Sequence, residues 1–94
     1  MPDKLMALQL VKTRLNRAQA DTKLDEYLAA RIDAAEGELK KTGITLTDSA
    51  EDMMFLVDYT VWQYQNRDKA AGMPEWLRDR RRNRWLQQKR GDNA

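Results

Sequence analysis

The sequence contains no cysteine and no histidine among its 94 residues. The absence of cysteine excludes disulfide bonds and thiolate metal sites, and it fits a reducing compartment. Without either residue, the chain also lacks the commonest general base and the best nucleophile of enzyme active sites. The four glycines stand isolated, so there is no glycine-rich phosphate loop. We therefore expect neither an enzyme nor a cofactor.

Long hydrophobic runs are missing as well. The longest covers residues 53–57, whereas a membrane-spanning helix needs about 20 apolar residues. The N-terminus reads Met-Pro-Asp-Lys and has no apolar signal region. We expect a protein that is made and kept in the cytoplasm and does not contact a membrane.

Charge is abundant but unevenly distributed. Charged residues make up 34% of the chain, and the formal net charge is only +2. Between residues 74 and 90, seven arginines and lysines stand against two carboxylates, a local excess of +5, which leaves −3 for the rest. A chain of this length forms one domain with a limited core. One end of that domain should be basic and the remainder mildly acidic.

Apolar residues recur at spacings of three and four along most of the chain, as in Leu5, Leu8, Val11 and Leu15. This period is typical of amphipathic helices, and no alternating strand pattern is present. The sequence predicts an all-α fold of four to five helices in a small bundle. We place the helices at about residues 3–15, 22–42, 48–67 and 74–89, with residues 90–94 as a frayed tail.

Residues that commonly start helices mark the predicted N-termini. Asp3 is suited to cap the first helix, and Asp21 or Thr22 the second. The third helix should start at Thr47 or Asp48, where Asp48 with Glu51 resembles a capping box.

A glycine and a proline mark the remaining boundaries. Gly43 suits the left-handed position that follows a helix, here the second. Pro74 suits the first position of the fourth helix, because its missing N–H has no helical partner there.

The predicted third helix is apolar on two opposite sides, which indicates a central helix covered on both. At 100° per residue, one side carries Met53, Val57, Thr60, Val61 and Tyr64, and the other carries Phe55, Tyr59 and Trp62. Either the other helices cover both sides within one subunit, or the aromatic side contacts a neighbouring subunit. Aromatic side chains are enriched at such interfaces, so Phe55, Tyr59 and Trp62 are the candidate subunit interface. Asp58, the carboxylate at the helix centre, is expected to pair with a cation.

The predicted fourth helix is rich in arginine. Three interpretations remain open: a solvated helix whose arginine stems cover apolar surface, a docking helix for an acidic protein, or a nucleic-acid contact. In the last case, Asn83 and Gln87 lie one turn apart and could read bases. The candidate contacts with a protein partner or DNA are Arg78, Arg80, Arg81, Arg82 and Arg84.

Two stretches carry a resemblance to a known family. Residues 56–68 read Leu-Val-Asp-Tyr-Thr-Val-Trp-Gln-Tyr-Gln-Asn-Arg-Asp, and residues 73–78 read Met-Pro-Glu-Trp-Leu-Arg. Together with the order of helices from Lys4 onward, they resemble the helical head–tail connector (adaptor, or head-completion) proteins of tailed phages and prophages. The similar pattern concerns apolar packing positions and the Asn66–Arg67 turn, and does not include the arginines between residues 78 and 90.

The resemblance implies a structural role in virion assembly, with no catalytic residue. Family members form a ring of about a dozen copies beneath the portal. The ring extends the DNA channel and binds both the portal protein and the head-closure protein. The chain would then reside in the virion, and in the bacterial cytoplasm during assembly. It could contact the passing DNA non-specifically, and it could be monomeric in isolation if the portal templates the ring.

Two rival functions belong to other classes. A small helical DNA-binding regulator would use the basic helix at residues 74–90 as its recognition element, with steep salt dependence. A metal-dependent nuclease would need a dicarboxylate site that binds a divalent cation. The carboxylates, however, occur among lysines and at helix starts, where solvation and capping account for them. We therefore expect no metal site.

Overall fold

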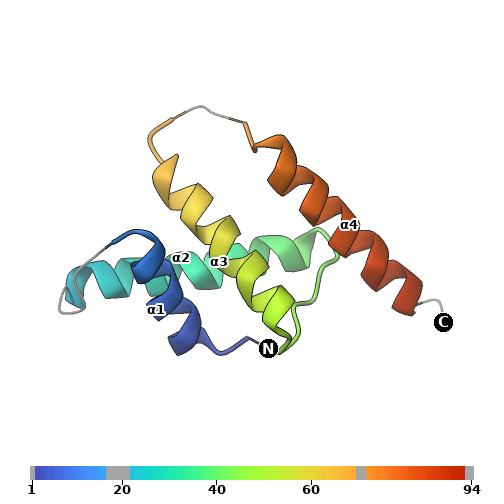
Figure 1. The fold of residues 1–94 in the computed structure, drawn as a ribbon, viewed down its shortest axis with the longest axis horizontal. Helices are drawn as coiled ribbons and strands as arrows, with labels where there is room; N and C mark the ends of the chain where they lie inside the picture. Colours follow the sequence, from blue (N-terminus) through green and yellow to red (C-terminus); the bar gives the residue numbers. More distant parts are fainter. Residues whose placement is uncertain (1, 17–21, 70–71, 93–94) are drawn as a thin grey trace.

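The computed structural model describes residues 2–16, 22–69 and 72–92. Within these ranges the chain forms four α-helices and no strand, which confirms the predicted all-α class (Figure 1). The helices are α1 (Lys4–Arg14), α2 (Thr22–Lys41), α3 (Ala50–Gln65) and α4 (Glu75–Asp92). None of these described helices combines the length and apolar character that crossing a bilayer would require.

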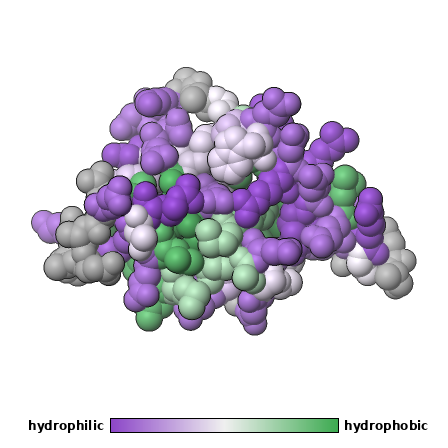
Figure 2. Space-filling model, in the orientation of Figure 1, coloured by the Kyte–Doolittle hydropathy of each residue, from purple (hydrophilic) through white to green (hydrophobic). Residues whose placement is uncertain are grey.

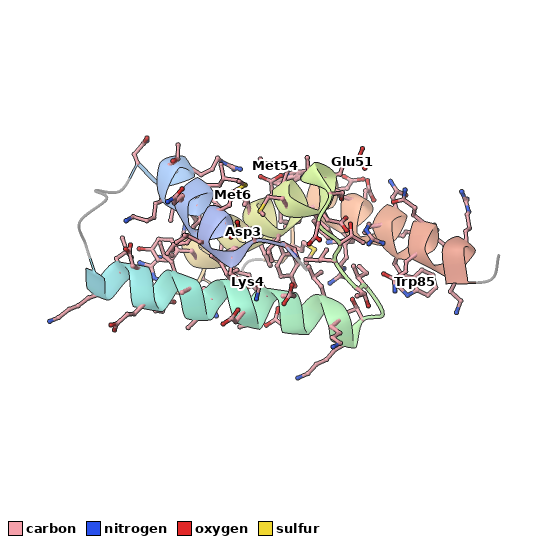
Figure 3. All side chains as sticks on the ribbon, turned by 90° about the horizontal axis from the view of Figure 1, so that it is seen from below. Asp3, Lys4, Met6, Glu51, Met54 and Trp85 are labelled. Atoms are coloured by element: carbon pink, nitrogen blue, oxygen red, sulfur yellow. The ribbon has the colours of Figure 1, made fainter. Side chains whose placement is uncertain are left out.

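Helices α1, α2 and α3 form the body of the molecule. Helices α1 and α3 both cross over α2, and each of the three contacts the other two (Figures 1 and 3). Helix α4 extends away from this body, and its backbone approaches none of the other helices as closely. The result is an elongated, flat molecule of 45 × 29 × 18 Å.

The core contains the apolar sides predicted for α3, whereas of the stripe predicted for the first helix only Val11 is fully buried and Leu5 is 66% exposed. Helix α2 buries Leu28, Ile32, Ala35 and Leu39 at spacings of three and four, so these residues form one stripe. Ala7 and Val11 of α1 and the central residues of α3 belong to the same cluster. Among the described side chains of α4, only Leu77 is fully buried. The core therefore lies in the three-helix body.

The start of α1 is as predicted, whereas the start of α3 is not. Asp3 caps α1, and its carboxylate accepts from the N–H of Leu5 at 3.0 Å and of Met6 at 3.2 Å. At α3 the cap is Ser49, whose hydroxyl accepts from the N–H of Asp52 at 3.1 Å. The predicted start at Thr47 or Asp48 is therefore wrong. Of the residues proposed to cap α2, Asp21 lies outside the described residues and Thr22 is the first helical residue.

The start of α3 lies later than predicted because a carboxylate within the helix binds the preceding turn. Asp52 accepts from the backbone N–H of Thr47 at 2.7 Å and from its hydroxyl at 2.8 Å. These bonds hold Thr47 outside the helix and leave Ser49 as the residue before the first turn. Reciprocal bonds of this kind satisfy donors that a helix start would otherwise leave unpaired.

The end of α2 is a Schellman motif, as the predicted stop at Gly43 requires. Gly43 has a φ of 96°, and its N–H donates to the carbonyl of Lys40 at 3.0 Å. The N–H of Ile44 donates to the carbonyl of Leu39 at 2.9 Å, and both side chains are buried. This turn directs the chain from α2 toward α3, and the side chain of Gln88 in α4 binds its backbone.

Replacing Gly43 with alanine is expected to destabilise the protein by about 1–2 kcal/mol, because a Cβ is strained at positive φ. The new Cβ would also lie 3.0 Å from Nε1 of Trp85. Gly37→Ala is the matched control, since Gly37 lies inside α2 and nothing is within 4 Å of its added Cβ. That variant should be more stable than the wild type by up to about 1 kcal/mol. Urea unfolding measures both, and an unchanged midpoint for Gly43→Ala would contradict the assigned conformation.

Helix α4 begins beside Pro74 and continues further than predicted. The carbonyl of Pro74 accepts from the N–H of Arg78 at 3.0 Å. The predicted frayed tail is wrong for residues 90–92, which are helical, while residues 93–94 lie outside the described part. The side chain of Gln88 explains the difference: it donates to the carbonyl of Gly43 at 2.9 Å and accepts from the N–H of Thr45 at 2.7 Å. This long-range anchor fixes the last turns.

Candidate interaction surfaces

The aromatic side of α3 is covered within the chain. Phe55 is 2% exposed and Tyr59 is 5% exposed, so the prediction that they form a subunit interface is wrong. The guanidinium of Arg80 lies 5.5 Å from the centre of the Phe55 ring, and the hydroxyl of Tyr59 donates to Glu38 of α2 at 3.2 Å. Trp62 is half-buried and packs against the core. Of the two alternatives, coverage by the chain's own helices is the one observed for Phe55 and Tyr59.

The hydroxyl of Tyr59 acts as a donor in this contact. Burial raises its pKa, and the nearby carboxylate of Glu38 raises it further, against a smaller opposing effect of Arg81. The ring also meets Phe55 and Trp62 edge-on, with centroids 6.3 and 6.0 Å away. Such aromatic pairs stabilise a packed interior beyond the area that they bury.

Asp58 joins three helices. Its carboxylate pairs with Arg14 of α1 and with Arg80 of α4, which confirms the expected cation partner. The side chain of Asp58 is mostly buried, so the two guanidinium groups compensate a charge that would be costly alone.

Asp52 and Arg84 form a bidentate ion pair between α3 and α4. The two oxygens of Asp52 accept from Nε of Arg84 at 2.8 Å and from its NH2 group at 3.0 Å. Arg84 also donates to the carbonyl of Thr45 at 2.9 Å. Burial alone would raise the pKa of Asp52, but hydrogen bonds from Arg84 and Thr47 outweigh it and hold the pKa below its ordinary value. The same bond raises the pKa of Arg84.

The five arginines predicted to contact a partner therefore divide into two groups. Arg80 and Arg84 face α3 and are paired with Asp58 and Asp52, so they hold the fold together. The other three line a shallow pocket of about 350 Å³ together with Thr42, Ile44 and Trp85: Arg78, Arg81 and Arg82. We call the part of α4 around this pocket the outer face.

The cations of the outer face have no carboxylate partner within the described part of the chain. Arg78 donates to the carbonyl of Met73 at 3.1 Å, and Lys89 lies 5.2 Å from the centre of the Trp85 ring. Neither of these contacts neutralises charge. The outer face is thus the portion of the predicted basic helix that stays available to an external partner.

A second surface was not among the predicted sites. A groove of about 600 Å³ runs between α1 and the start of α3, floored by Met6, Leu10, Met53 and Met54. Met6 is 51% exposed and Met54 is 40% exposed. Figure 2 shows hydrophobic side chains gathered over α1 and α3 on this side of the molecule. We call it the methionine groove.

The sequence held a weak signal for this groove. Met6 and Met54 lie beside the main apolar stripes of their helices, where a packed position is not required. Met is a flexible, polarisable residue that is frequent at adaptable binding surfaces.

Clusters of side chains suited to catalysis or metal binding are scarce in the described residues. Their carboxylates include no group of three that could hold a metal ion. The buried carboxylates Asp52 and Asp58 are bound by guanidinium groups. Comparison of the chain with protein-family models, with curated proteins and with solved structures found no match. Functional interpretation therefore rests on the two surfaces and on the pattern of residues 56–78.

Proposed function

We propose that this chain is a structural subunit of the head–tail connector of a tailed phage or prophage. In this role it joins a ring beneath the portal, extends the DNA channel and binds the portal and head-closure proteins. It is synthesised in the bacterial cytoplasm and becomes part of the virion. The observation that carries the proposal is the pattern of residues 56–68 and 73–78, which resembles connector proteins.

Several positions in that pattern build this fold, whereas others, such as Trp76, are exposed. Leu56 and Val57 are fully buried in the centre of α3. Asn66 caps the end of α3, where its side-chain amide donates to the carbonyl of Trp62 at 2.8 Å. Arg67 places its guanidinium 4.1 Å from the centre of the Tyr64 ring. The resemblance thus concerns residues with demanding structural roles, which supports a shared fold more than scattered surface identities would.

The distribution of surfaces also supports the proposal. A ring requires two different lateral surfaces on each subunit, because its contacts are heterologous. The chain has an apolar groove on α1 and α3 and a basic outer face on α4. A DNA-binding regulator is less well supported, since Arg80 and Arg84 are held by carboxylates of α3 and cannot reach phosphates without breaking those pairs.

Mixing the purified chain with particles of the portal protein from the same phage or prophage tests the proposal. We expect electron microscopy to show added ring density on one end of the portal, and co-sedimentation to show saturable binding. Portal particles already occupied by their own connector serve as the control and should bind no further copies. Absence of association at concentrations well above micromolar would reject the connector role. Binding to short duplex DNA with steep salt dependence and no portal binding would favour the regulator instead.

A further inference from the structure

The methionine groove and the outer face are two features that the folding of one chain leaves unexplained; Leu5, Tyr27 and Trp76 are also exposed but line neither surface. Met6 and Met54 expose apolar surface that nothing in the described residues covers. Arg78 and Arg82 are exposed and have no carboxylate partner there. Exposed apolar surface with a polar rim commonly marks a binding site for another protein.

The methionine groove has a negative rim. Asp3 and Asp48 line it, and Glu51 projects from the same end of α3 (Figure 3). Asp3 and Glu51 alone contribute −2, whereas the N-termini of α1 and α3 each contribute about +0.5, so the rim keeps a net charge of about −1. An occupant of this groove should combine apolar side chains with positive charge.

The outer face has that combination. Arg78, Arg81, Arg82 and Lys89 contribute +4, and Asp79, which directly follows Arg78, contributes −1, so the net charge is +3. Trp85 and Leu86 lie between these cations and are partly exposed. Helices of this kind bind by laying apolar anchors into a groove while flanking charges meet the rim. Arginine is well suited to such a rim because its guanidinium binds carboxylates through two bonds.

The two surfaces face in different directions, so the methionine groove of one copy cannot bind the outer face of the same copy. In Figure 3, Met6, Met54 and Glu51 lie on the upper side of the molecule, and Trp85 lies on the lower side of α4. A contact between unlike surfaces of two copies leaves one of each surface free, and further copies can add.

We propose that the methionine groove of one copy receives the outer face of α4 from a second copy. The contact is head-to-tail, with Met6 and Met54 against Trp85 and Leu86, and with the acidic rim against Arg78 and Arg82. This inference deepens the proposed function, and it rests on that function only for closure of the contact into a ring. One contact thereby accounts for both the exposed methionines and the unpaired arginines.

Analytical ultracentrifugation of the full chain at low ionic strength tests this contact. The groove variant is Met6→Asp/Met54→Asp, and the outer-face variant is Arg78→Glu/Arg82→Glu. All four residues are exposed, so both variants should fold, as circular dichroism and thermal unfolding will check. Wild-type mass should rise with protein concentration and fall with added salt. Each variant should weaken self-association by at least about tenfold.

Two controls make the result specific. Lys23→Glu/Lys41→Glu changes the charge by the same amount as the outer-face variant at exposed positions of α2, and it should self-associate like the wild type. An equimolar mixture of the groove and outer-face variants should form a 1:1 dimer and nothing larger. In that dimer the intact groove of one variant holds the intact α4 of the other, while the altered surfaces repel each other.

The inference is overturned if the wild type stays monomeric at the highest concentration, if either variant associates normally, or if the mixture forms no dimer. Loss of duplex DNA binding by the outer-face variant, with unchanged self-association, would assign that face to nucleic acid instead. Failure of the proposed function gives a different result. Head-to-tail association without portal binding would preserve the contact and reject the connector role. Normal portal rings built from either variant would preserve the connector role and reject the head-to-tail contact.

Discussion

Leu77→Ala is expected to release α4 from the rest of the chain while α1, α2 and α3 stay folded. Leu77 is 0% exposed, and it is the one fully buried side chain among the described residues of α4. Removing a buried leucine side chain costs about 2–5 kcal/mol. The backbone of α4 makes few close approaches to the other helices, so its attachment depends on this leucine together with the ion pairs of Arg80 and Arg84. We expect the substitution to weaken the attachment of α4 to the other helices and to leave the packing of α1, α2 and α3 intact.

Native-state hydrogen exchange measures this release segment by segment. In Leu77→Ala, the amides of α4 should exchange faster than in the wild type, while protection in α1–α3 should change little. Leu28→Ala is the matched control, because Leu28 is also 0% exposed but lies in the three-helix body. That variant should reduce protection in all helices together. Equal loss of protection in α3 and α4 of Leu77→Ala would show that α4 is an integral part of one cooperative unit.

Local chemistry explains which parts of the fold could be predicted from the sequence. The helical periods place all four helices, and their bounds differ from the observed ones by three residues or fewer. Asp3 and Gly43 act on the backbone within a few residues, so their roles follow from residue type alone. The start of α3 could not be read in this way. Asp48 and Ser49 are both good caps, and the choice depends on the bonds that Asp52 makes to Thr47 and Arg84.

The candidate surfaces depend on contacts between distant parts of the chain. At 100° per residue, Arg80 and Arg84 fall on one side of the helix, and Arg78 and Arg82 fall on the other. This angular spacing could not say which side faces α3, because that depends on Asp58 and Asp52 as partners. The aromatic side of α3 was ambiguous for the same reason. Its cover comes from Glu38 and Arg80, which lie 21 and 25 positions from Tyr59 and Phe55.

Paired arginines on one side of α4 and unpaired ones on the other imply different sensitivities to mutation. Substitutions at Arg80 or Arg84 should change stability, because these side chains compensate buried carboxylates. Substitutions at Arg78 or Arg82 should leave stability nearly unchanged, since exposed charges contribute little. The ion pairs of Arg80 and Arg84 and the cations of the outer face can therefore be tested separately on the same helix.

Asp52→Asn is expected to destabilise the protein by about 3 kcal/mol near neutral pH, because it leaves Arg84 without its charged partner. The carboxylate of Asp52 accepts two bonds from Arg84 and two from Thr47. A neutral amide has one acceptor oxygen, so it cannot replace these four bonds. Glu51→Gln is the matched control, since Glu51 lies on the same turn, is exposed and makes no ion pair within the described residues. That variant should differ from the wild type by less than about 0.5 kcal/mol.

The difference in the free energy of unfolding between wild type and Asp52→Asn should decrease as the pH falls. The folded-state pKa of Asp52 lies below its ordinary value, and the unfolded value is about 3.9. Between the two, the unfolded state binds more protons, so wild-type stability rises with pH there. The contribution is complete above about pH 5 and is lost as pH falls through the folded pKa. Urea unfolding of dilute protein from pH 7 downward should show the two stabilities converging in acid. A difference that stays constant through that window would mean that the charge of Asp52 is not what fastens α4 to α3.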